Sequence, residues 1–139
     1  MSYDPGMPPT PQFNDPQTYT ILGAAMAVHR QLGNGFSEAV YSEAFAQALA
    51  ARRIPFAAEA FLPVVYNGQR LSTSFRADFV CYKQVIVEIK ALASVAGPAH
   101  AQVLNYLKAS GLERGLLINF GAARLEWRRF IWTRHRERQ

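Results

Sequence analysis

Residues 74–90, SFRADFVCYKQVIVEIK, decide the fold of this chain and its chemistry. The pattern on both sides of Tyr82–Gln84 is typical of two strands joined by a tight turn. If those three residues form the turn, the antiparallel register places Asp78 directly opposite Glu88, with the two side chains ~5 Å apart on one face. The sequence therefore predicts a pair of facing carboxylates inside otherwise apolar strands.

Two facing carboxylates need a cation, because they repel each other and raise the pKa of at least one of them. The chain offers Lys90 next to Glu88, and oxygen ligands converging in this way also suit Mg²⁺ or Mn²⁺. Such a metal activates a water and neutralises charge on a phosphodiester, and a neighbouring lysine can orient that water. The alternative, from these strands alone, is a buried ion pair between Lys90 and either carboxylate.

Hydrophobic spacing and turn residues divide the rest of the chain into helices and strands. Asn67-Gly68 is a strong hairpin signal. A strand followed by a helix and then by a buried apolar strand implies a parallel, right-handed crossover, so the fold class is α/β with a mixed sheet. The predicted helices cover 18–32, 38–53 and 98–110, and the predicted strands cover 59–66, 72–82, 84–90, 115–120 and 124–132.

Composition indicates one globular domain of 139 residues, of which 50% are hydrophobic. The lone cysteine, Cys81, excludes a disulfide framework and a multi-cysteine metal site within one chain, which favours a reducing compartment. No apolar run approaches the ~20 residues that span a bilayer, and the N-terminus lacks a secretory signal. We therefore expect a soluble, cytoplasmic protein with no membrane partner.

The two ends of the chain differ from the centre. Five of the eight prolines fall in residues 1–17, which we expect to be a flexible arm, and residues 18–132 form the expected domain. Residues 133–139 are the expected basic tail. Six arginines lie between Arg124 and Gln139, and they suit a polyanion such as nucleic acid, although a solubilising end is an equal alternative.

Five motifs in order resemble the GxxExxY protein family, which is placed in the PD-(D/E)xK nuclease-like superfamily. The resemblance extends from His29 to Phe120, and Ala77 stands where the superfamily motif has proline. Besides Gly35, Glu38 and Tyr41, which spell the family's own motif, the matching segments are HRQLGNG at 29–35, AD at 77–78, VEIKA at 87–91, HAQ at 100–102 with NYL at 105–107, and LINFG at 117–121.

This resemblance implies a restriction-endonuclease-like αβββαβ core with a mixed central sheet flanked by helices. It carries over Asp78, Glu88 and Lys90 as the metal-binding and catalytic residues. Glu38 is similar to the helical acidic residue that adds a metal ligand in many members, and His29 is a further candidate ligand unless it is a core histidine. The QxxxY helix motif of RecB-like nucleases, which supports the site and contacts DNA, is matched by Gln102 and Tyr106.

The resulting hypothesis is a metal-dependent nuclease that hydrolyses DNA, with the Ile89 carbonyl as a further ligand to Mg²⁺ or Mn²⁺. The alternative is a nucleic-acid-binding module on the same fold that is catalytically silent or depends on a partner. Because a small core with few insertions shows no clear DNA-clamping element, a homo-oligomer is also an expectation.

Overall fold

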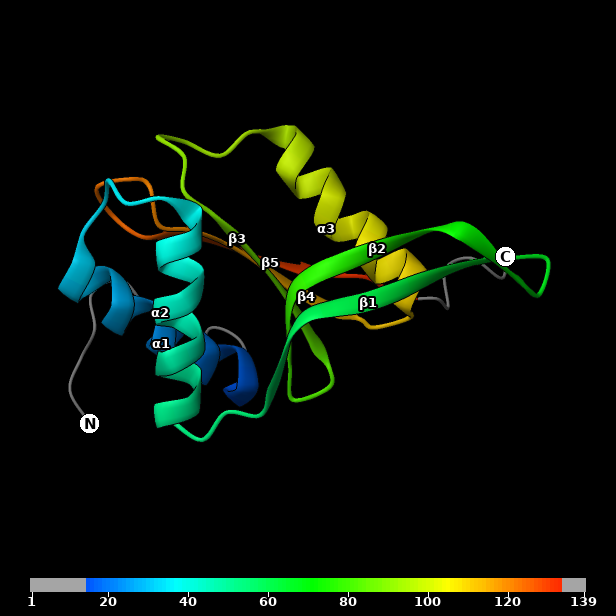
Figure 1. Cartoon of the computed structure of the whole chain (residues 1–139), viewed down its shortest axis with the longest axis horizontal. Coiled ribbons are helices and arrows are strands. Elements are labelled where there is room, and N and C mark those ends of the chain that lie inside the picture. Colours follow the sequence, from blue (N-terminus) through cyan, green and yellow to red (C-terminus); the bar gives the residue numbers. More distant parts are fainter. Residues whose placement is uncertain (1–14, 134–139) are drawn as a thin grey trace.

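The computed structural model describes residues 15–133, which form a twisted sheet with helices on both faces (Figure 1). Every predicted helix and strand is present, in the predicted order. The proline-rich residues 1–14 and the basic residues 134–139 lie outside the described part. The elements are α1 (Pro16–Leu32), α2 (Glu38–Ala51), β1 (Phe56–Tyr66), β2 (Gln69–Cys81), β3 (Val85–Lys90), α3 (Gly97–Ser110), β4 (Arg114–Asn119) and β5 (Glu126–Ile131).

The five strands are ordered β1-β2-β3-β4-β5. The β3–β4 pair is parallel and the other pairs are antiparallel, so the predicted mixed α/β fold with its crossover through α3 is confirmed. Helices α1 and α2 pack on one face, against Val85, Val87 and Ile89 of β3. Helix α3 packs on the other face, against Ile86. Because both faces of β3 are covered, its one acidic residue, Glu88, enters a buried environment.

Helix α1 begins at Pro16, two residues before the predicted helix start at Thr18, and Asp15 is its N-cap. The carboxylate of Asp15 accepts a hydrogen bond from the backbone N–H of Thr18 at 3.1 Å and caps α1. It also forms ion pairs with Arg114 at 2.7 Å and Arg129 at 2.9 Å. Burial alone would raise the pKa of Asp15, but these partners hold it below its ordinary value.

The β1–β2 hairpin is longer than predicted and runs past the rest of the sheet (Figure 1). The ladder between β2 and β3 covers Phe79–Cys81, whereas the ladder between β1 and β2 continues outward to the pair Tyr66↔Gln69. Asn67 and Gly68 both have positive φ and close a two-residue turn, so pairing continues up to the turn itself. We call the projecting part, residues 60–77, the arm.

None of the helices within residues 15–133 has the length and apolar character that a bilayer-spanning segment needs.

Candidate active site

The turn at Tyr82–Gln84 sets the predicted register, since Cys81 pairs with Val85 and Phe79 with Val87. One pair further along, the backbone N–H of Asp78 donates to Oε2 of Glu88 at 2.7 Å. The backbone N–H of Ile89 donates to Oδ2 of Asp78 at 2.8 Å. Each carboxylate therefore fixes the backbone of the opposite strand, and the predicted facing arrangement is present at the point where β2 leaves β3.

These carboxylates are held in an environment that disfavours their charge. Glu88 is only 3% exposed, and burial, followed by the charge of Asp78, raises its pKa to about 8. Burial also raises the pKa of Asp78, although the Ile89 hydrogen bond and the charge of Lys90 counteract it. Because one lysine leaves both pKa values raised, the pair would be stabilised by a further cation.

Glu38 reaches this site through the geometry of the α1–α2 connection. Gly35 has a φ of +112° there, a conformation that favours glycine. The Tyr41 hydroxyl donates to the carbonyl of Gly33 at 2.5 Å, and its ring stacks on Phe120 at 4.9 Å. Glu38 lies in the first turn of α2, and its pKa is raised by partial burial and then by the charge of Asp78. The GxxExxY residues thus anchor the connection and bring an acidic group within electrostatic range of the pair.

Helix α3, which packs on the face of the sheet opposite α1 and α2, carries the predicted polar stripe. Nε2 of Gln102 donates to the hydroxyl of Tyr106 at 3.0 Å. The Tyr106 ring is buried against Phe75, with 5.0 Å between ring centroids. Burial, followed by the charge of Glu88, raises the pKa of Tyr106. Gln102 and Tyr106 therefore act as one hydrogen-bonded unit beside the carboxylates.

His29 lies apart from this pair. Its Nε2 is 3.0 Å from the carbonyl oxygen of Ala122, and its ring lies 6.3 Å from that of Phe120. Within residues 15–133, no three His, Cys, Asp or Glu side chains are grouped so that they could hold a metal together. The structure thus joins neither His29 nor Glu38 to Asp78 and Glu88 as a preformed three-side-chain ligand set, and their metal roles stay predictions.

The donor chemistry of the Asp78–Glu88 pair nevertheless fits a hard divalent cation. The hydrogen bonds described above use one oxygen of each carboxylate, and each carboxylate carries a second oxygen. Mg²⁺ is commonly bound through one or two carboxylates plus waters and substrate phosphates, without a complete protein cage. The second oxygens of Asp78 and Glu88 are therefore the groups that could hold such a cation.

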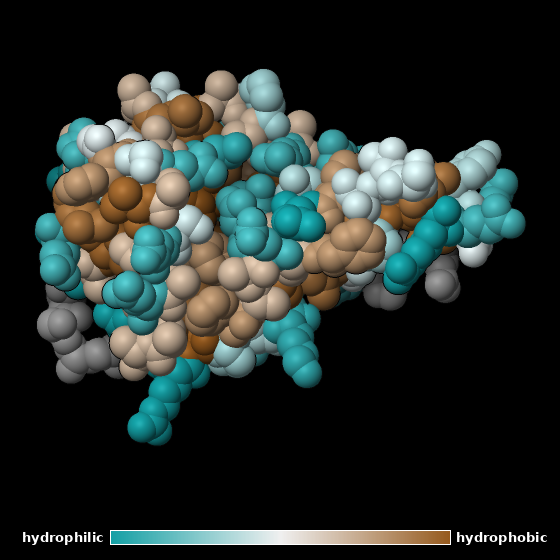
Figure 2. Space-filling model, viewed as in Figure 1, coloured by the Kyte–Doolittle hydropathy of each residue, from teal (hydrophilic) through white to brown (hydrophobic). Residues whose placement is uncertain are grey.

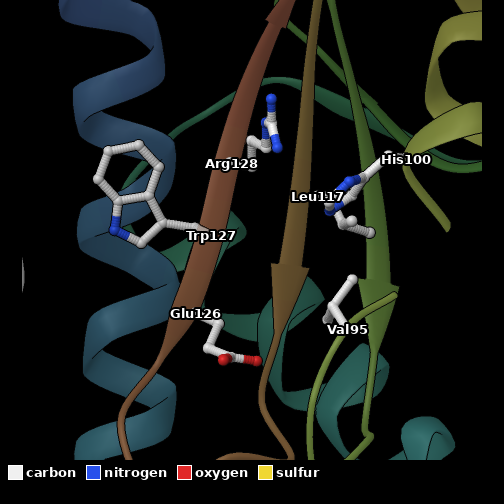
Figure 3. A pocket seen from close by; sticks show the side chains of 6 residues that line it. All are labelled: Val95, His100, Leu117, Glu126, Trp127 and Arg128. Atoms are coloured by element: carbon white, nitrogen blue, oxygen red, sulfur yellow. The ribbon is translucent and has the colours of Figure 1, made fainter. Parts of the chain in front are cut away.

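Two of the hollows on the described surface differ in their relation to the site. A groove of about 500 Å³ between α2 and β1 is lined by Glu38 and Glu59, among others. A smaller hollow of about 180 Å³ lies over β4 and β5 and contains neither Asp78 nor Glu88 (Figure 3). The residues that line this second hollow are Val95, His100, Leu117, Glu126, Trp127 and Arg128.

A comparison with models of protein families matches residues 15–130 to the PD-(D/E)XK nuclease superfamily. The chain belongs to that superfamily. No curated protein matches it. The solved crystal structure of SSO0001 is similar in fold, with a TM-score of 0.52 and 16% sequence identity. The match covers 89% of this chain and 59% of the SSO0001 chain, so this chain spans about three fifths of that protein's length.

Membership in the nuclease superfamily gives the carboxylate pair a chemical context. Nucleases of this superfamily act on nucleic acids and typically use divalent metals. In this chain, Asp78 and Glu88 come from the adjacent strands β2 and β3, and Lys90 is the last residue of β3.

Asn119 and Gly121 belong to the LINFG segment of the resemblance, but sequence reasoning missed their role in holding the end of β3 in place. Asn119 is 1% exposed, and its side chain accepts from the N–H of Leu92 and donates to the carbonyl of the same residue. A Cβ on Gly121 would lie 2.3 Å from the backbone nitrogen of Leu92, so only glycine permits this approach. An asparagine within the apolar run LLINF was the signal, because a buried amide requires partners.

Glu59 was also missed. It lies in β1 between Ala58 and Ala60, which pair with Phe79 and Ala77, so it is level with Asp78. Its φ is +50°, which is unusual for a non-glycine residue inside a strand. Its charge contributes to the raised pKa of Asp78. No spacing pattern in the sequence predicts a positive φ at Glu59.

Proposed function

We propose that this chain is a metal-dependent nuclease that hydrolyses phosphodiester bonds in DNA. One observation carries the proposal: the half-buried Asp78 and the buried Glu88 face each other beside Lys90, with pKa values raised above their ordinary values. Two carboxyl groups placed together where burial disfavours their charge cost the protein stability, and a cation that needs both would offset that cost.

In this proposal Asp78 and Glu88 hold Mg²⁺ or Mn²⁺, with the Ile89 carbonyl and Glu38 as further ligands. The bound cation would lower the pKa of a water and neutralise the charge that develops on the phosphodiester. The protein supplies the orientation, because the two hydrogen bonds between the strands fix both carboxylates before any ligand arrives.

The other residues act on the water and on the substrate. Lys90 is the group that orients the attacking water and stabilises the developing negative charge. Its position depends on the end of β3, where the N–H of Phe120 donates to the Lys90 carbonyl at 2.9 Å. Gln102 and Tyr106 position the α3 side of the site and contact the DNA.

The direct test combines a titration of divalent cations with cleavage of linear, nicked and single-stranded DNA and of RNA. Wild type is expected to cut DNA with Mg²⁺ or Mn²⁺, and D78A and K90A to lose cleavage while keeping the melting temperature and circular dichroism of the fold. K83A, in the exposed turn after β2, is the matched control and should cut normally. If the wild-type protein binds metal but cuts none of these substrates, the proposal is contradicted. The alternative, a catalytically silent nucleic-acid-binding module, would then be favoured.

We also place the protein in the reducing environment of the cytoplasm. Cys81 is buried among the α1–α2 core residues, and burial raises the pKa of its thiol to about 12. A thiol of this kind is a packing group with little reactivity.

A further inference from the structure

The arm leaves one of its two faces open to solvent. Where strands pair antiparallel, directly paired residues share a face. The pair Leu62↔Phe75 belongs to the core cluster beneath α3. The alternate pair Phe61↔Arg76 therefore lies on the opposite, outer face, and Phe61 is 55% exposed there. The outer face thus carries exposed side chains that the domain core does not need.

Charge on the arm is of one sign. Residues 60–77 contain two charged side chains, Arg70 and Arg76, and no acidic one. The guanidinium of Arg70 lies 5.8 Å from the centre of the Phe61 ring, on the face to which Arg76 also belongs. The rest of the surface of β2 here is hydroxyl-rich, with exposed Ser72–Ser74. Figure 2 accordingly shows the projecting part as mostly pale and teal, with patches of brown. A hydroxyl-rich ribbon that carries two arginines and no acidic residue is complementary to a polyanion.

The tip of the arm has the shape and side chains to read a DNA groove. A two-stranded ribbon, with strands ~4.8 Å apart, fits the ~12 Å major groove of B-form DNA. Asn67 and Gln69 expose amide groups at the turn, and Tyr66 beside them is 68% exposed. Amide and guanidinium side chains are the groups that hydrogen-bond base edges in the major groove.

The arm also lies at the right place relative to the carboxylates. Arg76 precedes Asp78 by two residues, or ~7 Å of strand, and Arg70 precedes it by ~26 Å. One turn of B-form DNA is ~34 Å long. A duplex with a phosphodiester at Asp78 can therefore meet Arg70 and the tip within the same helical turn.

We propose that the arm is the DNA-docking element of this protein, with its tip in the major groove of a duplex and Arg70 and Arg76 on the phosphates. The inference rests on the proposed function and names its substrate as duplex DNA. It also replaces the sequence-based view that the small domain lacks a clamping element. The exposed ring of Phe61 beside Arg70 adds apolar contact area on this face, and the exposed Tyr66 adds contact area at the tip.

The test measures binding of a labelled 30-base-pair DNA duplex by fluorescence anisotropy in EDTA, where no cleavage occurs. The arm variant is R70Q/R76Q, and the matched control is R53Q/K83Q, which removes the same charge at the opposite end of the hairpin. The arm variant is expected to bind about tenfold more weakly or worse, and the slope of log K against log salt should fall by about 1 for each arginine. The control should change binding less than about twofold. R70K/R76K, which keeps the charge, should restore most of the salt slope.

Further measurements separate the competing outcomes. Single-stranded DNA and an RNA duplex should bind more weakly than the DNA duplex, because A-form RNA has a major groove too narrow for the ribbon. Equal loss in the arm and control variants, or equal binding of duplex RNA, overturns the inference. A third outcome also overturns the inference: wild type self-associates with rising concentration, and the arm variant loses this self-association but still binds DNA. The arm would then be a contact between copies of the chain.

Cleavage distinguishes this failure from failure of the proposed function. The arm variant should still cut DNA at saturating concentrations, and D78A should still bind the duplex. A wild type that cuts DNA, with R70Q/R76Q binding it normally, overturns the docking role alone. A wild type that neither binds nor cuts overturns both proposals.

Discussion

The carboxylate site lies on β2 and β3 and the arm on β1 and β2, so the two regions share strand β2, yet their environments are opposite. At Asp78, strand β2 is enclosed by β3 and by groups from α2 and α3, and the neighbouring Glu88 is almost fully buried. A few residues earlier, the outer face of β2 carries arginines and hydroxyls in solvent. Burial makes charge costly and therefore chemically responsive, whereas exposure lets positive charge attract a polyanion over a distance. Strand β2 thus connects a site suited to chemistry with a surface suited to binding.

The largest expected effect is a loss of cleavage without a loss of DNA binding, which distinguishes the carboxylate site from the arm. E88Q should lower the rate of metal-dependent DNA cleavage by about 10³-fold or more, because it removes one of the two charges that hold the cation. Its affinity for duplex DNA in EDTA should stay within about twofold of wild type. Single-turnover cleavage and anisotropy on the same preparation measure both quantities. Loss of binding together with loss of cleavage would show that the two regions are not separable.

The next effect tests whether the end of β3 depends on close backbone packing. G121A places a Cβ 2.3 Å from the backbone nitrogen of Leu92, so either Leu92 or the Gly121 loop must move. We expect the free energy of unfolding to fall by about 2–4 kcal/mol, with reduced cleavage by the folded fraction. G97A is the control, because a Cβ at Gly97 meets nothing within 4 Å. Equal melting temperatures for the two variants would contradict the close packing.

A third effect concerns pH and the metal-free protein. The pKa of Glu88 is about 8 in the folded state against an ordinary value of 4.5, so folding favours its protonated form. Its contribution to stability is full below pH 4.5 and is lost as the pH rises through 8. In EDTA, E88Q should therefore melt more than about 5 °C above wild type at pH 9, and differ little from it at pH 4.5. Parallel melting curves at all pH values would show that Glu88 carries no such penalty.

Much of this account was readable in the sequence, and the reasons are local. The alternation around Tyr82–Gln84 fixes which residues face each other, so the Asp78–Glu88 pairing followed from counting across a turn. Gln102 and Tyr106 were found because a spacing of four residues puts them on one helix face. The capping role of Asp15 was missed, although an Asp-Pro pair at the start of a helical pattern is a capping signal.

Other features depend on tertiary structure that spacing does not encode. From the sequence the arm resembled an ordinary hairpin. Nothing within residues 60–77 indicates that the pairing of β2 with β3 stops at Phe79. Likewise, Glu59 reaches the level of Asp78 through a left-handed backbone conformation inside a strand. The family resemblance suggested His29 as a metal ligand, and that role stays a prediction. The contact between its Nε2 and the carbonyl oxygen of Ala122, 93 residues later, could not be predicted from spacing.

The smallest expected effect is at the α3 side of the site. Y106F removes the hydroxyl that accepts the Gln102 hydrogen bond but keeps the ring that packs on Phe75. Cleavage should fall by about two- to tenfold, with the melting temperature nearly unchanged, because the helix still packs. Y66F, at the exposed arm tip, serves as the comparison and should leave the cleavage rate at saturating DNA unaltered. A loss as large as that of E88Q would mean that Tyr106 takes a direct part in the chemistry.

The claim on which the account depends is that Asp78 and Glu88 together hold a divalent cation. Isothermal titration of Mn²⁺ into wild type and into the D78N/E88Q variant, at pH 8 and without DNA, tests it most directly. We predict saturable binding to wild type and none to the variant, with both proteins folded by circular dichroism. Equal binding by the two proteins, or no binding by wild type even with a non-cleavable DNA present, would contradict the claim.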